Sequence, residues 1–126
     1  MRSERPNLFF HAIDAVGGFE PRGDGAPGIS IKVLSSDLDT DRKRGSRTRL
    51  LRLDPGTSTP EAHAHDYWEE IYMLEGEMTV HEDGQVKTVG PHTYAARKPG
   101  VMHGPVSSKT GCLMIDFCWY ESGEDK

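Results

Sequence analysis

The sequence predicts an all-β protein of one domain, folded as a closed barrel or as two packed sheets. The chain has 126 residues, which is the size of a single domain. Fourteen glycines and eight prolines indicate many turns, and therefore many short elements. Short apolar runs recur between these turns, and no longer stretch shows the 3.6-residue period of an amphipathic helix. Because 35% of the residues are hydrophobic, a thin-walled barrel fits the composition better than a helical bundle.

Alternation and turn residues place the expected strands along the chain. Ile29, Ile31 and Val33 alternate with polar residues, which is typical of a half-buried strand. Asp83-Gly84 is the best hairpin turn in the chain. The expected strands or extended stretches are 8–10, 29–34, 48–53, 57–65, 70–74, 77–81, 85–89, 93–97, 101–106 and 112–120, with loops over 17–28 and 35–46.

This pattern divides the chain into three parts. Residues 1–28 carry few periodic signals and are expected to form an N-terminal arm. Residues 29–120 hold the regularly spaced strands of the barrel domain, and residues 121–126 form a polar tail.

Charge and composition argue against some classes of binding partner. The net charge of −5 argues against nucleic acid or an anionic membrane surface as the main partner. A local basic run follows three aspartates and is expected to be a solvated loop; it comprises Arg42, Lys43, Arg44, Arg47 and Arg49. No apolar run reaches the ~20 residues of a membrane helix, and no secretory leader is evident at the N-terminus. We therefore expect neither nucleic acid nor a membrane as a partner, and a cytoplasmic location.

The two cysteines agree with that location. Cys112 and Cys118 are six residues apart in one expected strand. At ~3.3 Å per residue their side chains lie about 20 Å apart, too far for a disulfide between them. They are expected to be buried, reduced thiols, which fits the cytosol.

One stretch concentrates metal-binding chemistry. His63 and His65 are spaced i and i+2, and the acidic Glu69 and Glu70 follow shortly after. In an extended strand, alternate side chains share a face, so both imidazoles would point the same way. Two imidazoles and a carboxylate on one face make most of a metal site.

The surrounding spacing resembles the two motifs of the cupin superfamily. The first has the form G-x(5)-H-x-H-x(3,4)-E-x(6)-G, and here it runs from Gly56 through the two histidines and Glu69 to Gly76. The second has the form G-x(5)-P-x-G-x(2)-H-x(3)-N, and here Gly90, Pro99-Gly100 and His103 follow it more loosely. In this second motif the chain is two residues longer, Lys98 stands at the usual first proline, and Ser107 replaces the final asparagine. The likeness covers roughly residues 48–120.

The resemblance implies a single-domain cupin-type jelly-roll β-barrel, often dimeric, that holds one divalent metal. By position the implied ligands are His63, His65, Glu69 and His103. Imidazole ligands suit Zn, Fe, Ni and Cu, and a carboxylate also admits Mn and Fe. Iron is favoured, with zinc, nickel and manganese as alternatives, and a homodimer is expected.

The choice of glutamate is a question of strand register. Glu69 and Glu70 point to opposite faces of a strand. If Glu69 faces inward, Ile71 and Met73 do too; if Glu70 does, Tyr72 and Leu74 line the interior. The motif spacing favours Glu69.

Other candidates lack such context. Glu70 and Tyr94 are weak candidates for a catalytic base, and Tyr67 and Trp68 are placed to wall the barrel mouth. Arg47 and Arg49 share strand parity with Leu51 and Leu53. We expect the two arginines to be solvated, although an inward arginine would hold an anionic substrate.

Three functions fit these observations. A metal-dependent oxygenase or dioxygenase acting on a small organic molecule is favoured, because among cupins the three-histidine, one-glutamate set is that of iron dioxygenases. The alternatives are a non-oxidative isomerase, cyclase or lyase that uses the metal as a Lewis acid, and a non-catalytic module that binds a small ligand or a metal.

Overall fold

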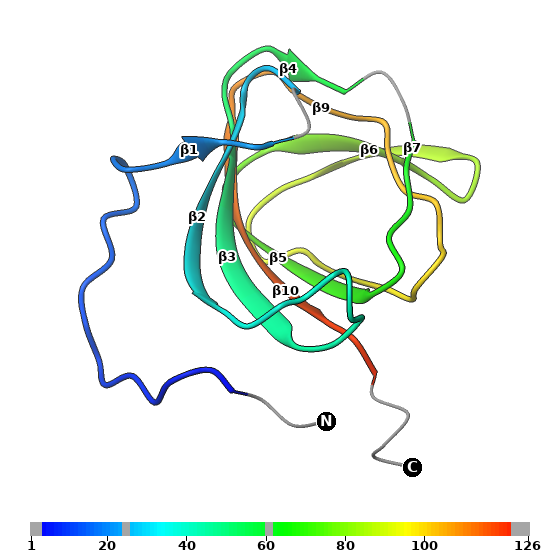
Figure 1. Cartoon of the computed structure of the whole chain (residues 1–126). Helices are drawn as coiled ribbons and strands as arrows, with labels where there is room; N and C mark the ends of the chain where they lie inside the picture. The colour runs from blue at the N-terminus through cyan, green and yellow to red at the C-terminus, as the bar shows by residue number, and fades with distance from the viewer. Residues whose placement is uncertain (1–3, 24–25, 60–61, 122–126) are drawn as a thin grey trace.

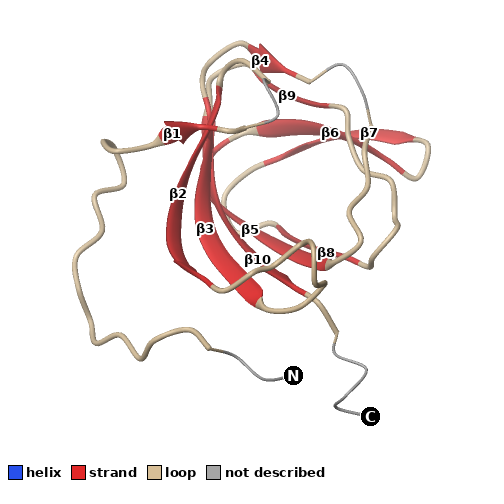
Figure 2. Ribbon diagram, in the orientation of Figure 1, coloured by secondary structure: helices blue, strands red, loops and turns tan. Residues whose placement is uncertain are grey.

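The structure is a computed structural model that describes residues 4–23, 26–59 and 62–121. Within these ranges the secondary structure consists of strands alone, as Figure 2 shows. The strands are β1 (Glu20–Pro21), β2 (Ile29–Ser36), β3 (Ser46–Leu53), β4 (Thr57–Ser58), β5 (Trp68–Gly76), β6 (Met78–Glu82), β7 (Gln85–Val89), β8 (Tyr94–Arg97), β9 (Val106–Ser108) and β10 (Cys112–Trp119). The described residues include no helix that could cross a membrane.

Two antiparallel sheets face each other around a common interior (Figure 1). The larger sheet has the order β1-β2-β3-β10-β5-β8, and the smaller has the order β4-β9-β6-β7. The expectation of an all-β jelly-roll fold is therefore confirmed. The chain before β1 runs out to one side of the two sheets.

Strand β10 forms the centre of the larger sheet and fixes its register. It pairs with β3 on one side and with β5 on the other. Asp116 lies opposite Arg49 of β3, and Cys118 lies opposite Glu69 of β5. Residues that are far apart in sequence thus come together on one face.

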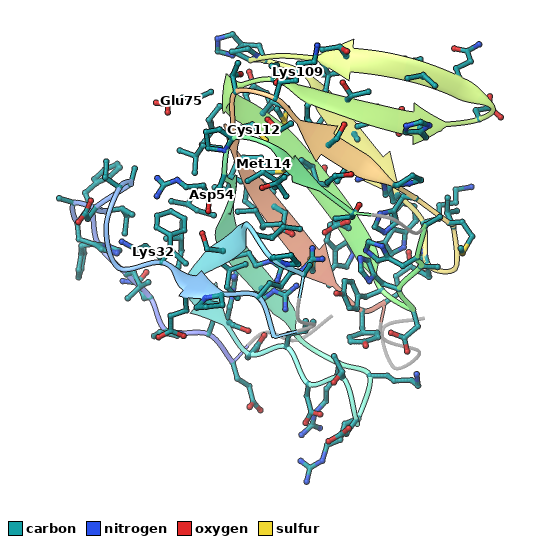
Figure 3. All side chains as sticks on the ribbon, turned by 90° about the horizontal axis from the view of Figure 1, so that it is seen from above. Lys32, Asp54, Glu75, Lys109, Cys112 and Met114 are labelled. Atoms are coloured by element: carbon teal, nitrogen blue, oxygen red, sulfur yellow. The ribbon has the colours of Figure 1, made fainter. Side chains whose placement is uncertain are left out.

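The core is formed by the apolar side chains on the inner faces of both sheets. Cys112 and Met114, which Figure 3 labels, are buried on β10. The core cluster contains Ile29, Leu51, Leu53, Met73, Met78, Val80, Cys112 and Met114. Both cysteines are free and buried.

The hairpin between β6 and β7 follows from its turn residues. Asp83 and Gly84 have φ angles of 52° and 74°. Both lie in the left-handed region that a two-residue hairpin of type I′ requires, and the Asp-Gly pair tolerates it. Strand β7 coincides with the predicted range.

Three local predictions are wrong. Residues 8–10 form a loop, with Phe9 and Phe10 largely exposed and no strand beside them in the described chain. The stretch 57–65 is a strand only at Thr57–Ser58 among its described residues, and Pro60 lies outside those residues. In the predicted loop 17–28, Glu20–Pro21 pairs with β2, so the expected arm supplies a short edge strand. Of the expected tail, the structure describes Glu121 alone.

Candidate metal centre

The two histidines of the first motif lie in an irregular segment between β4 and β5. Their position is fixed by backbone pairing with the second motif. The amides of His63 and His103 each donate to the other's carbonyl at 2.8 Å. The Gly100 amide donates to the His65 carbonyl at 2.7 Å. These backbone hydrogen bonds hold the two motifs together, although the motifs are about forty residues apart in sequence.

The three imidazoles converge. The ring centroids are 5.2 Å apart for His63 and His65, 4.3 Å for His63 and His103, and 4.8 Å for His65 and His103. One nitrogen of each ring lies within 4.8 Å of a nitrogen on the other two. Three nitrogens at this spacing can share one metal ion.

Glu69 approaches this cluster from β5. Its side chain is 3% exposed. Its Oε1 atom lies 3.7 Å from His65 Nε2 and 4.0 Å from His103 Nε2. Glu69 and Ile71 face the interior, and Met73 is buried in the core. Of the two strand registers that the sequence left open, this is the one with Glu69 inward.

Two atoms at the centre are buried without a hydrogen-bond partner, namely Glu69 Oε1 and His103 Nε2. A buried acceptor without a partner is costly, so such atoms call for an explanation. A metal ion beside both atoms would satisfy them. The donor set, three imidazoles and one carboxylate, therefore fits a divalent ion such as Fe, Zn, Ni or Mn.

The local electrostatics favour the ligating forms of both side chains. Burial and the nearby Arg97 guanidinium lower the pKa of His103 to about 4. Burial acts to raise the pKa of Glu69, but the polar contacts with His65 and Asp116 outweigh it and lower that pKa. At neutral pH His103 is a neutral imidazole and Glu69 a carboxylate, as metal binding requires.

A second buried carboxyl group, that of Asp116, lies close to Glu69. Asp116 of β10 is fully buried, and Arg49 Nε donates to its two carboxylate oxygens at 3.0 and 3.1 Å. Burial raises the pKa of Asp116, Arg49 opposes this rise, and the neighbouring Glu69 adds to it. Of the two acids, Asp116 therefore takes up a proton first and can donate it in a hydrogen bond to Glu69.

Sequence reasoning missed Asp116 as a site residue. A usable signal was present, because Asp116 shares strand parity with Met114 and Cys118 in an otherwise apolar segment. An acid at an inward position of a central strand needs a partner. Finding that partner, Arg49, requires the strand order.

The metal-binding candidates line a cavity of about 460 Å³ between the sheets. Strand register puts Arg47, Glu69 and Arg97 in one row across the larger sheet, and with the histidines this row forms the polar end of the cavity. The other end, beside Ile29 and Leu53, is mainly apolar but also includes Arg22. The lining residues are Arg22, Ile29, Arg47, Arg49, Leu51, Leu53, His63, His65, Tyr67, Glu69, Ile71, Met78, Arg97, His103, Val106 and Met114.

The expectation that Arg47 and Arg49 are solvated is wrong. Both face the cavity, and Arg49 is 7% exposed. Strand β3 lies between β2 and β10 in the larger sheet, so the face shared with Leu51 and Leu53 is interior. Arg49 is accommodated there by its ion pair with Asp116.

Aromatic residues lie near the polar end. The ring of Tyr67 stacks on His65 with centroids 4.7 Å apart, and Tyr67 lines the cavity. Trp68 instead stacks on Trp119 at 5.9 Å. Of this pair, Tyr67 is the one that walls the cavity.

The weak catalytic candidates lie elsewhere. Tyr94 is 56% exposed and its hydroxyl donates to Glu70. Neither residue lines the cavity, because Glu70 and Tyr94 lie on the opposite face of β5 and β8. The structure thus gives neither residue access to the three imidazoles.

Comparisons with known proteins bear on the family and the fold of the chain. A family model for the ChrR cupin-like domain matches residues 21–120. Among curated proteins, no sequence matches the chain.

Solved structures with the same fold are numerous, and three span most of the chain. An RmlC-like cupin from Shewanella frigidimarina shows 21% identity over 98% of this chain and 99% of its own, with a TM-score of 0.69. KdgF from Halomonas sp. shows 20% identity over 96% and 100%, with a TM-score of 0.69. The polyketide cyclase RemF from Streptomyces resistomycificus shows 24% identity over 90% and 81%, with a TM-score of 0.68. At these identities the likeness establishes the fold.

Proposed function

The chain belongs to the cupin superfamily as a ChrR cupin-like domain, and we propose that it is a mononuclear metal enzyme acting on a small organic molecule. The metal would be held by His63, His65, His103 and Glu69. One observation carries the proposal: Glu69 Oε1 and His103 Nε2 are buried, lack a hydrogen-bond partner, and lie 4.0 Å apart beside two further imidazoles.

The proposed ion would supply Lewis-acid activation of a bound substrate or, as Fe(II), activation of O2. The protein's own contribution is positional. Arg49 holds Asp116, whose carboxyl group lies within 4.8 Å of the Glu69 carboxylate, and Tyr67 stacks on the ring of His65. Four protein ligands leave open positions on an octahedral ion, and an open position distinguishes a catalytic site from a structural one.

An oxygenase is our first proposal, and a non-oxidative isomerase, cyclase or lyase is the second. The fold shared with a polyketide cyclase supports the second. An Fe(II) form treated with nitric oxide without air first tests for the open position that both reactions need and a non-catalytic binding module does not, because an iron-nitrosyl EPR signal requires one. Oxygen consumption with a candidate substrate then supports the oxygenase, and turnover without oxygen supports the Lewis-acid reaction.

Metal content tests the proposal directly. Elemental analysis of the purified chain should find about one divalent ion per chain. His103→Ala should lose most of it, whereas His81→Ala, which changes an exposed histidine of β6, should keep it. Equal metal content in both variants would contradict the assigned ligands. Stoichiometric metal without an exchangeable position would instead favour a non-catalytic binding module.

We also propose that the chain forms a homodimer in the cytoplasm. Phe9 and Phe10 are largely exposed on the N-terminal arm. Large exposed aromatic side chains are typical of protein contacts. Light scattering should give twice the chain mass, and a monomer that persists at high concentration would contradict the dimer.

A further inference from the structure

The cavity is basic although the chain as a whole is acidic. The net charge of the chain is −5. Four arginines line the cavity, and among the described lining residues Glu69 is the one carboxylate. A bound divalent cation would add further positive charge. Such a concentration of one sign inside a low-dielectric space attracts ions of the opposite sign.

Arg97 has hydrogen-bonding capacity that the protein does not use. It lies on β8, directly across from Glu69 of β5. Its Nη1 atom is buried and has no hydrogen-bond partner. Nη1 lies 3.8 Å from Glu69 Oε1, and Nη2 lies 3.7 Å from Glu82 Oε2. Both contacts are ion pairs, but both are too long for a hydrogen bond. If Glu69 serves a metal, still less of its charge is available to Arg97.

Arg47 also has unused hydrogen-bonding capacity. It lies on β3, which β10 and β5 separate from β8. Figure 2 shows these strands in one sheet. Its Nε atom is buried without a hydrogen-bond partner, and its Nη2 atom donates to the Cys118 sulfur at 3.4 Å. A thiol is a weak acceptor. The guanidinium lies 5.9 Å from the centre of the Tyr67 ring, which itself stacks on His65. Arg47 therefore sits beside the proposed metal ligands without a strong anionic partner of its own.

Arg49 provides the internal contrast. Its Nε atom is matched to both oxygens of Asp116, so its charge is balanced within the protein. Among the described residues Arg97 has only its two longer ion pairs, at 3.8 and 3.7 Å, and Arg47 forms no ion pair with a carboxylate. Burying a guanidinium without such a partner is costly, and a carboxylate that binds through two parallel hydrogen bonds is its best complement.

The opposite end of the cavity determines the rest of the ligand. It is walled mainly by aliphatic and thioether side chains from both sheets, including Leu51, Met78 and Val106, although Arg22 also lines it. The volume of about 460 Å³ is that of a small-molecule site. A ligand that fills the cavity must present an anionic group to the arginines and an apolar body to this wall.

We propose that the substrate is a small organic carboxylate with an apolar body, and that Arg47 and Arg97 bind its carboxylate. This inference rests on the proposed function, because it assigns the substrate class of the same site. Arg47 and Arg97 thereby become specificity-determining residues next to the metal ligands.

The test compares a carboxylate with its neutral isostere. Binding of phenylacetate and of phenylacetamide to the full chain is measured by titration calorimetry, with metal-free and with zinc-loaded protein. Phenylacetate should bind about tenfold or more tightly than the amide in both forms, because only the acid forms charge-assisted hydrogen bonds with the arginines. Hexanoate and hexanamide form a second pair with an aliphatic body.

Variants locate the effect. Arg47→Gln and Arg97→Gln should each weaken carboxylate binding by about tenfold and leave amide binding unchanged. The matched control is Arg52→Gln, which changes an arginine of the same strand β3 that hydrogen-bonds the carbonyls of Ala15 and Val16 instead. Arg47→Lys and Arg97→Lys retain the charge and should recover part of the affinity, and they replace the glutamine variants if those fail to fold.

Three results would overturn the inference: equal affinity for acid and amide, no saturable binding of either acid, or glutamine variants that bind the acids as the unsubstituted chain does. The last result would mean that the metal alone holds the anion. Metal content is measured on the same samples. If metal-loaded protein binds neither acid, the proposed substrate class is refuted and the proposed metal centre stands. Metal-free protein that binds the acids but never takes up metal refutes the metal centre alone.

Discussion

The two faces of the larger sheet carry similar residues in very different surroundings. Glu69 and Glu70 are neighbours on β5, yet Glu69 is 3% exposed beside the imidazoles, while Glu70 pairs with an exposed tyrosine. On β3, Arg47 and Arg49 line the cavity, and Thr48 between them lies on the outer face. Because side chains alternate along a strand, a shift of one residue would exchange the two faces.

This contrast shows that residue type alone does not identify the site. The inner face tolerates charge only where a partner is present, as Arg49 and Asp116 show. The outer face can solvate its charges without a partner. Substitutions on the inner face should therefore be costly, and substitutions on the outer face should be mild.

The largest expected effect is on stability. Asp116→Leu removes the partner of the buried Arg49, and breaking a buried pair in this way costs about 3–5 kcal/mol of unfolding free energy. Urea denaturation of the metal-free chain measures the loss. The double variant Asp116→Leu, Arg49→Met removes both charges and should recover much of it. A loss below about 1 kcal/mol in the single variant would show that the ion pair is not buried as described.

The second effect is on metal affinity and compares the two glutamates directly. Glu69→Gln should weaken metal binding by at least about 10–100-fold, the range found even when only a ligand's supporting residue is lost. Glu70→Gln, one residue away on the outer face, should leave the affinity unchanged. Competition with a colorimetric chelator measures both. The reverse order would mean that Glu70 is the inward residue.

The third effect concerns pH. The pKa of His103 in the folded chain is about 4, below its ordinary value of 6.5. The unfolded chain therefore binds this proton first, so the metal-free protein should lose stability as the pH falls from 6.5 to 4 and no further from this residue below 4. At about 1.4 kcal/mol per pH unit, the loss from His103 is at most about 3–4 kcal/mol.

A matched variant isolates that contribution. His103→Gln should flatten the dependence of unfolding free energy on pH in this window, and His81→Gln should not. If unfolding free energy depends on pH in the same way for the unsubstituted chain and for His103→Gln, then folding does not lower the pKa of His103.

The smallest effect belongs to the outer face. Tyr94→Phe removes an exposed hydroxyl that donates to Glu70. Stability should change by no more than about 0.5 kcal/mol, and metal content should not change. Thermal unfolding and elemental analysis check both. A marked loss of metal would connect the outer face to the site and would remove the contrast between the two faces.

The sequence predicts the local features well. The Asp83-Gly84 turn, the strand 85–89 and the strand that begins at Ile29 depend on neighbouring residues, and all three appear in the fold. The predicted alternation of that last strand is not regular, because Val33 is 49% exposed. The motif spacing selected Glu69, which does face the interior. These features are local, so neighbouring residues suffice to specify them.

The remaining features depend on pairing over long distances. Arg49 and Asp116 are 67 positions apart, and they meet because β10 enters the sheet beside β3. His63 and His65 share a side without a strand, because backbone bonds to residues 100 and 103 hold them. Residues 8–10 have a strand-like composition but no partner strand in the described chain. Composition and periodicity carry no information about strand order, so these outcomes needed the structure.

Anomalous scattering from a metal-loaded crystal tests the central claim most directly. The account predicts one strong peak in the cavity, about 2.0–2.2 Å from a nitrogen of His63, His65 and His103 and from an oxygen of Glu69. Data collected on both sides of each absorption edge would identify the element. A peak coordinated by Glu70, or a fully loaded crystal with no peak among these four residues, would contradict it.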